Sequence, residues 1–504
     1  MLNNTIRIVP FPKDLCQPLP EIVGNVDYKV YEKTLKYIDQ LLRDSGIEEW
    51  AMQYYLQQHV DPNTLKDDHE SSPFEEYHQE KLQITAKQAL RCIIARRFVD
   101  LAYRDFTCRL AESPLLQWFC QIESFVKVIV PSKSTLHRYE MFFEKDAIQK
   151  ITQLLLQAAN QNHNHLGLTE AIDLSNLFVD LTCIKANIHY PVDWVLLRDA
   201  TITLMKAVKV IRNNGLKNRM EPPELFITNI NKLSIKMTHS QYKPGSKKYR
   251  KNVLRGMKKL LKKITKHARK HLELLENEWK TTDLSEKQKD QIVKRMNNVI
   301  QQLPAAIEQA HERIIGERQV ANDKKILSLY EPDVHVIVRG KAGARVEFGN
   351  SIFLAEQKDG LIVDWHLYKE QPPADCKTLI PAIERINAAY KVKINSLTGD
   401  RGFWDKDNKE YLEKNTIANY ICPRAVRVLS EKLKSKKFRK AQTRRAQTEG
   451  RIGILKNCFI GNPFKRKRFA NQEVSVAHAI LTHNLWVLAR LMIANEPEEL
   501  KEAG

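Results

Sequence analysis

Paired cysteines are absent from this 504-residue sequence. Its eight cysteines lie scattered along the chain, and none forms a C-x-x-C pair. This spacing argues against a zinc module and favours a reducing compartment.

Long apolar runs are absent as well. The nearest candidate, Val476 to Ala494, is interrupted by two histidines, an asparagine and an arginine, so we expect no membrane-spanning segment. The opening stretch, MLNNTIRIVPFPKDL, lacks a cationic region followed by an apolar one, so we expect no secretion signal and a cytoplasmic protein. The apolar fraction of 43% is nevertheless that of a folded chain, and the length predicts two to four domains.

Acidic residues are scarce in two segments of a chain whose formal net charge is +21. Lys243 to Lys280 contains fourteen Lys and Arg against three acids, and Pro423 to Arg468 contains sixteen against two. A single lysine run is often only a solvated helix face. Two such segments indicate a protein that neutralises phosphates along a path, so we expect nucleic acid as the partner and no membrane.

The first third of the chain has apolar residues at helical spacing, most clearly from Thr85 to Phe119. A helix is also expected after the breaker in VPSKSTLHRY, with Ser132 or Ser134 as its N-cap. Its first turns would point Thr135 and Arg138 outward. That arrangement suits a recognition helix in a helix-turn-helix, and equally an ordinary capped helix.

The remaining pattern predicts an α/β unit with a long interruption. Ser175 to Pro191 alternates like a strand or hairpin, and long helices follow it. Strand signals then return, with a hairpin turn expected at Asp359-Gly360, and alternate with helices. Without the interruption this order gives a mixed sheet covered by helices. We therefore expect a helical N-terminal DNA-binding region at residues 1–165 and a basic helical insertion at residues 195–325. The insertion splits an α/β catalytic domain into residues 166–194 and 326–490, and residues 491–504 form a tail.

Three acids in this unit stand out. Asp180 lies inside an apolar strand, where a carboxylate is costly unless it is paired or bound to a metal. Asp400 follows a short strand, in TGDRGF, where it could equally cap the next helix. Glu449 lies in the basic helix RRAQTEGRIGILKN and shares a stripe with Arg445 and Lys456, which could also be a weak surface ion-pair arrangement.

Taken together, the three acids predict a site for hard cations. Mg²⁺ or Mn²⁺ prefers carboxylate oxygens, waters and substrate phosphates. Two such ions can activate a water or a 3′-hydroxyl and stabilise the leaving oxygen of a phosphodiester. The basic neighbours of Glu449 would then hold the scissile strand against the metal. Asp173, Asp193 and Asp364 lie near the same segments and are competing candidate ligands.

FVDLT, LTGDRGF and RRAQTEGRIGILKN together resemble the three acid motifs of bacterial insertion-sequence transposases of the DDE type. One branch of that family has the signature Y-x2-R-x3-E-x6-K, which Arg445, Glu449 and Lys456 match in spacing, whereas Gln442 replaces the tyrosine. The resemblance extends from about residue 85 to about residue 490. The 219 residues between the first two acids imply a helical insertion after the first strand.

The resemblance implies an RNase H-like mixed sheet and a DNA transposase that cleaves and joins element ends. Asp180, Asp400 and Glu449 would be the catalytic residues and would hold two Mg²⁺, or Mn²⁺. The implied partners are the inverted-repeat ends and target DNA, bound by a homodimer or larger synaptic complex in a bacterial cytoplasm, at the nucleoid. The expected DNA-binding residues are Arg445, Lys456, Arg444, Arg451, Lys258, Lys259, Lys262, Lys263 and Arg138.

The sequence leaves other functions open. An RNase H-like nuclease that cuts without joining would need the same acids. A nucleic-acid-binding protein descended from a transposase would be expected to have lost one of them, and all three are present. A basic ribosome-associated protein would not need convergent acids at all.

Overall fold

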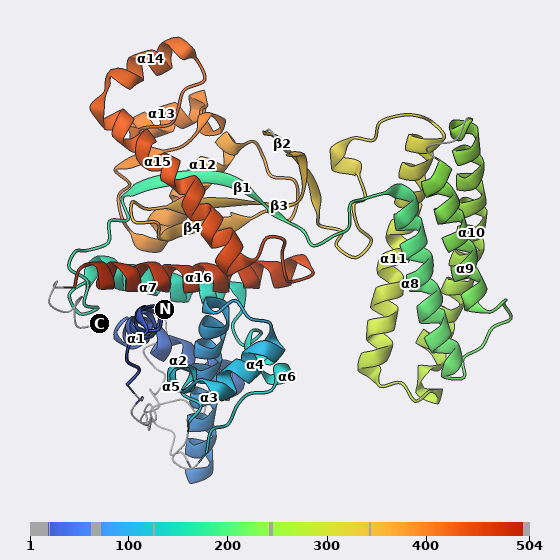
Figure 1. Cartoon of the computed structure of the whole chain (residues 1–504), viewed down its shortest axis with the longest axis horizontal. Helices are drawn as coiled ribbons and strands as arrows, with labels where there is room; N and C mark the ends of the chain where they lie inside the picture. The colour runs from blue at the N-terminus through green and yellow to red at the C-terminus, as the bar shows by residue number, and fades with distance from the viewer. Residues whose placement is uncertain are drawn as a thin grey trace.

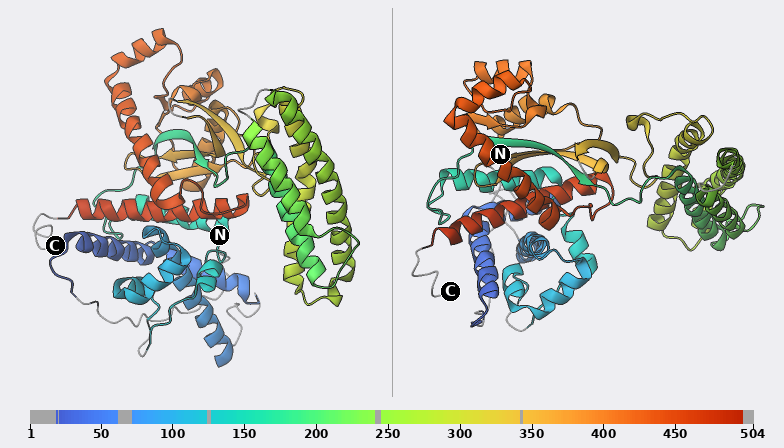
Figure 2. Two further views of the ribbon diagram at one scale, coloured as in Figure 1. Left: turned by 45° about the vertical axis from the view of Figure 1, so that its right-hand side comes forward. Right: turned by 45° about the horizontal axis from the view of Figure 1, so that its top comes forward.

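The computed structural model describes residue 19 and residues 21–61, 72–123, 127–240, 245–341 and 344–496. The first eighteen residues and most of the expected tail, 497–504, therefore lie outside the described part of the chain. Figures 1 and 2 show two bodies: a layered one that contains the sheet, and a bundle of long helices to one side of it.

The N-terminal part of the layered body is helical. Its longest helix is fixed by local chemistry at its start, because Ser72 and Glu75 form a capping box and Pro73 occupies the first helical position. Ser132 caps a short helix by accepting from the Thr135 N–H at 3.2 Å, as one of the two predicted caps. The helices are α1 (Val26–Asp44), α2 (Ile47–His59), α3 (Pro73–Phe98), α4 (Tyr103–Glu112), α5 (Pro114–Cys120), α6 (Lys133–Tyr139) and α7 (Lys145–Gln161).

A six-stranded mixed sheet forms the centre of the layered body and confirms the predicted α/β class. The order is β2-β3-β1-β5-β6, with β4 also paired to β3; β1 is antiparallel to β3 and parallel to β5. The predicted hairpin is present between β3 and β4, and Gly360 in its turn has a φ of 98°, which favours glycine. The strands are β1 (Asn176–Lys185), β2 (His335–Lys341), β3 (Ala344–Glu356), β4 (Ile362–Leu367), β5 (Ser396–Thr398) and β6 (Ala418–Asn419).

Helices of the C-terminal third surround this sheet. α15 crosses β1 and β5, while α16 runs beside α1 and α7 and contacts β4 (Figure 1). The elements are α12 (Asp375–Tyr390), the 3₁₀ turn η5 (Arg401–Phe403), α13 (Lys406–Lys414), α14 (Val426–Lys434), α15 (Lys436–Ile454), the π-helical turn η6 (Leu455–Ile460) and α16 (Phe469–Ala494).

α16 has the length and composition of a membrane-spanning helix, but 78% of its most apolar window is buried inside the protein. Asn484, on this helix, binds the backbone of Ile362 in β4 through both its amide oxygen and its amide nitrogen, at 2.9 Å each. We therefore describe α16 as a core helix of the layered body.

The insertion between β1 and β2 is a helical bundle with its own hydrophobic core. Leu204, Leu261 and Leu303 are among its fully or almost fully buried residues. Its helices are α8 (Asp193–Asn213), α9 (Pro223–His239), α10 (Ser246–Glu278) and α11 (Glu286–Ile314), with short 3₁₀ turns η3 (Trp279–Thr281) and η4 (Asn322–Lys324).

The N-terminal helices and the sheet share one continuous cluster of buried apolar residues, which runs from Leu35 to Met492. The sequence predicted the N-terminal region as a separate unit, whereas in the structure α7 and α16 join it to the sheet. Periodicity shows that a helix has an apolar face, but it does not show which element covers that face.

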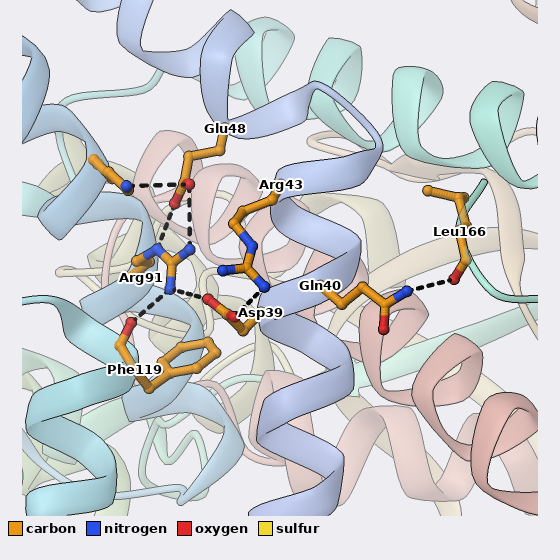
Figure 3. A network of polar contacts seen from close by, with 8 residues as sticks. Asp39, Gln40, Arg43, Glu48, Arg91, Phe119 and Leu166 are labelled. Carbon is orange, nitrogen blue, oxygen red and sulfur yellow. Dashed lines mark hydrogen bonds and ion pairs between the residues drawn. The ribbon is translucent and has the colours of Figure 1, made fainter. Parts of the chain in front are cut away.

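A buried arginine ties the N-terminal helices together (Figure 3). Arg91 on α3 is fully buried; it forms an ion pair with Glu48, and its Nη1 lies 2.7 Å from Asp39 Oδ1. Its Nη1 also donates to the Phe119 carbonyl at 2.9 Å. Burial alone would lower the pKa of Arg91, but the two carboxylates raise it, so the guanidinium stays charged.

Candidate active site

Asp180, Asp400 and Glu449 line the same cleft, although 268 residues lie between the first and the last. The cleft has a volume of about 360 Å³. Its remaining walls are Leu181, Thr182, Ile452, Gly453, Lys456, Asn457 and Asn462. The structure therefore brings together the three acids that the sequence selected.

Asp180 is held in place by the middle of β1. It lies opposite Leu354 of antiparallel β3, and β5 pairs with β1 two residues earlier, at Phe178. β1 is thus hydrogen-bonded on both sides, so its backbone is firmly placed. The strand alternation then directs Asp180 to the sheet face that α15 crosses.

Asp400 lies two residues beyond the end of β5 and is the N-cap residue of η5. Its Oδ1 accepts the Gly402 N–H at 2.8 Å, so the capping role that the sequence left open is realised. Its Oδ2 lies 3.7 Å from Nη2 of Arg445. One carboxylate therefore caps a turn, lines the cleft and contacts a cation on α15.

A fourth acid lies beside Asp400 and was missed in the sequence. A Cβ on Gly402 would come within 2.3 Å of Asp375 Oδ2 and within 3.0 Å of Asp400 Oδ1. Burial, and then the negative charge of Asp400, raise the pKa of Asp375. Asp375 is at the first position of α12, and no strand or spacing signal linked it to the site.

Glu449 lies on the stripe of α15 that faces the cleft, with Ile452 and, one turn further, Lys456. Lys456 is not in the α-helix itself but in the π-helical turn η6, where its Nζ donates to Thr182 Oγ1 at 3.3 Å and to the Cys183 carbonyl. Apart from their chain neighbours and the backbone of their own helix, Gly450 and Gly453 have no heavy atom within 4 Å of the position of an added Cβ. The helix surface at both glycines is open, which lets an extended ligand come close to the backbone.

Arg444 and Arg451, which the sequence predicted as DNA contacts, lie on another stripe of α15 and bind the β3–β4 turn. Arg444 Nε and Arg451 Nη1 donate to the Lys358 carbonyl at 2.7 and 2.9 Å. Gln442, at the position of the family tyrosine, donates to the carbonyls of Tyr420 and Gly399 at 2.6 and 3.3 Å. These side chains attach α15 to the sheet. Of the other two predicted contacts, Lys456 in η6 lines the cleft, and Arg445 on α15 reaches it through Asp400.

The three competing acids lie outside the residues that line the cleft. Asp173 accepts from Ser175 and Asn176, and these hydrogen bonds outweigh burial and lower its pKa. Asp193 binds Gln309 and Arg313 in the bundle. Asp364 forms a bidentate pair with Arg385 at 2.6 and 3.1 Å; burial raises its pKa and Arg385 opposes that rise.

The basic segment of the insertion forms one face of α10. Lys259, Lys262 and Lys263 are exposed, as a nucleic-acid contact requires, whereas Lys258 Nζ lies 3.2 Å from His311 Nδ1 and is half-buried. Arg138 on α6 is exposed and donates to Thr135 Oγ1 at 3.3 Å. α6 contacts α3, and Leu136 on it is buried. Whether α6 recognises DNA stays a prediction.

The donors of the cleft suit a hard cation in kind. They include the carboxylate oxygens of Asp180, Asp400 and Glu449, which Mg²⁺ and Mn²⁺ prefer to thiolate or imidazole. Asn462 also lines the cleft, and its Oδ1 already accepts the Lys185 N–H at 3.1 Å. Within the described ranges, no three His, Cys, Asp or Glu side chains form a ready cluster around one point. Mg²⁺ usually binds through one or two carboxylates together with waters and substrate phosphates, so the cleft fits that mode better than a closed protein cage.

Comparisons of the chain with family models, with curated proteins and with solved structures gave no match.

Proposed function

We propose that this protein is a DNA transposase of the DDE type, with an RNase H-like catalytic domain that cleaves and joins phosphodiesters. The observation that carries the proposal is the convergence of Asp180, Asp400 and Glu449 on one cleft. They come from a central strand, a strand end and a cationic helix, and ordinary core packing does not require three carboxylates to meet there. The mixed sheet with flanking helices is the architecture that an RNase H-like domain would need.

Each residue of the cleft would have a separate task. The three carboxylates would hold the cations, while Arg445 and Lys456 would contact phosphates beside the scissile bond. The open helix surface at Gly450 and Gly453 would leave room for the sugar-phosphate backbone. When bound, two Mg²⁺ ions would activate the attacking water or 3′-hydroxyl and stabilise the leaving oxygen.

The bundle would supply a second contact to the duplex, through five exposed cations of α10 that recur every three or four residues. We call this set the α10 stripe; it consists of Arg255, Lys259, Lys262, Lys266 and Arg269. Its ends are fourteen helical rises apart, so it is about 21 Å long. Among the described residues, no member of the stripe is in an ion pair, so all five charges are available for phosphates.

Nicking of a supercoiled plasmid in the presence of Mg²⁺ tests the catalytic part of the proposal. Asp400→Asn is the sharpest variant, because the asparagine oxygen can still accept the Gly402 N–H and preserve the cap. We expect nicking by the wild type, and none by Asp400→Asn or Glu449→Gln. Asp173→Asn is the matched control outside the cleft and should nick normally. Equal nicking by wild type and Asp400→Asn would remove the site assignment.

Incubation of a pre-cut DNA end with a target plasmid then separates a transposase from a nuclease. Joined product supports transposition, whereas nicking without joining would favour an RNase H-like nuclease. Duplex binding without any nicking would favour a binding protein descended from a transposase. Sizing the protein with and without end DNA tests the proposed homodimer or larger synaptic complex.

A further inference from the structure

A buried ion pair lies on the sheet beside the proposed site, outside the residues that line the cleft. Glu356, at the end of β3, is 1% exposed. Its Oε1 accepts from Arg444 Nη2 at 2.8 Å and from Thr448 Oγ1 at 2.7 Å, while its Oε2 has no hydrogen-bond partner. A carboxylate buried in this way is strongly bound to the partners that it has, both of which are on α15.

The pair shares a sheet face with the first acid of the cleft. Glu356 lies opposite Phe178 in the β1–β3 register, and Phe178 precedes Asp180 by two residues. Residues two apart in a strand project to the same face, about 7 Å from each other. The Arg444 guanidinium stacks 4.6 Å from the centre of the Phe178 ring. The ion pair therefore fastens α15 to the sheet one step along β1 from Asp180.

α15 and η6 are fastened to the sheet at two places, and Glu449 lies between them. On one side Arg444 and Thr448 bind Glu356, and Arg444 also donates to the Lys358 carbonyl. On the other side, in η6, Lys456 donates to Thr182. Glu449 follows Thr448 directly in the chain, so a shift of the helix along β1 would carry Glu449 with it.

We propose that Glu356 and Arg444 are positioning residues, whose buried pair, completed by Thr448, fixes α15 along β1 and so sets Glu449 opposite Asp180. The inference rests on the proposed function, because it assumes that the cleft binds a divalent cation. It also gives Arg444 a role other than contact with DNA. Partners that orient the ligands of a metal site typically contribute about 10- to 100-fold to metal affinity or activity.

Binding of Mn²⁺, followed by the electron paramagnetic resonance signal of the free ion, tests the proposal without relying on activity. The variants are Glu356→Gln, Arg444→Gln and their double, with Thr448→Val and the conservative Thr448→Ser as a milder pair. Arg385→Gln is the matched control, because Arg385 also pairs a helix with a strand carboxylate but lies outside the cleft. Duplex affinity and thermal unfolding are measured on the same proteins.

We expect Glu356→Gln and Arg444→Gln to weaken Mn²⁺ binding and nicking by about 10- to 100-fold, with the double variant no worse than the poorer single one. Duplex affinity should change by less than about twofold, because Arg444 is engaged inside the protein. Thr448→Val should weaken Mn²⁺ binding and Thr448→Ser should restore it, while Arg385→Gln leaves it unchanged. If Glu356→Gln and Arg444→Gln do not fold, the comparison of Thr448→Val with Thr448→Ser tests the positioning role.

The outcomes separate this inference from the proposed function. The positioning role alone would be overturned if Mn²⁺ binding is lost in Glu449→Gln but kept in Thr448→Val and in the folded Glu356→Gln and Arg444→Gln variants. Loss of duplex affinity in Arg444→Gln, with Mn²⁺ binding intact, would return Arg444 to the DNA interface. Absence of any Mn²⁺ binding that depends on Asp180, Asp400 or Glu449 would overturn the proposed function and the positioning role with it.

Discussion

Neutralising part of the α10 stripe gives a quantitative test of nucleic-acid binding. We consider the triple variant in which Lys259, Lys262 and Lys266 become glutamine. Each phosphate contact contributes about 0.9 to the slope of log affinity against log salt, so removing three contacts should flatten the slope by about 2.7. Between about 50 and about 200 mM salt, the wild type should therefore lose about 40-fold more affinity than the variant. The three residues are exposed, so the fold should be unaffected.

The assay is fluorescence anisotropy of a labelled duplex over that salt range. A matched control removes three exposed cations from α11 instead, at Lys287, Lys294 and Arg295, and so changes the net charge equally. The control should keep a slope close to that of the wild type. Equal salt slopes for the wild type and the triple variant would refute a contact between DNA and the α10 stripe. An equally flattened slope in the α11 control would show that the net charge, and not a localised contact, causes the effect.

Three further predictions concern the layered body. Gly453→Ala should stabilise the protein by about 1 kcal/mol in thermal unfolding, because the position is open and alanine favours the helix. The same change should slow nicking if the DNA backbone comes close to α15 at this position. Undiminished nicking would contradict that close approach. Arg91→Met should lower the free energy of unfolding in urea by about 3–5 kcal/mol, because it leaves Glu48 buried and short of a partner. Arg43 is half-exposed, so Arg43→Met should lower it by less than about 1 kcal/mol. Similar losses in the two variants would show that burial of the Arg91 ion pairs is not the cause. Burial lowers the pKa of His483 to about 4. In the unfolded chain His483 takes up a proton as the pH falls through about 6.5, whereas in the folded protein it stays neutral to about pH 4, so the free energy of unfolding should fall by about 2 kcal/mol by about pH 5. A His483→Phe variant should therefore lose about 2 kcal/mol less between pH 7 and pH 5 than the wild type. An identical loss in both proteins would exclude His483 as the cause.

Much of the fold follows from patterns that act over short distances. The hairpin at Asp359-Gly360 was predicted because a glycine with a positive φ and flanking alternation are local requirements of the turn. The basic helix around Glu449 and the helical nature of the insertion follow equally from periodicity and charge. The mixed sheet followed from the order of strand and helix signals.

The three acids can be identified from the sequence because their neighbours along the chain are unusual for an acidic residue. Asp180 interrupts an apolar strand, Asp400 follows a strand directly, and Glu449 is almost alone among cations. Asp375 gives no such signal, because an acid in the first turn of a helix is ordinary. Only the packing of α12 beside η5 brings it to Asp400.

The side chains that could carry metal-dependent chemistry can be identified from the chain alone, because residue type, helical spacing and charge density are properties of the sequence. Tertiary structure decided which of them can act together. Arg444 and Arg445 are neighbours in the chain, yet one is bound to Glu356 inside the protein and the other contacts Asp400 at the cleft. Helical geometry places adjacent residues about 100° apart around the helix axis, and only the docking of α15 on the sheet determines which direction faces the site.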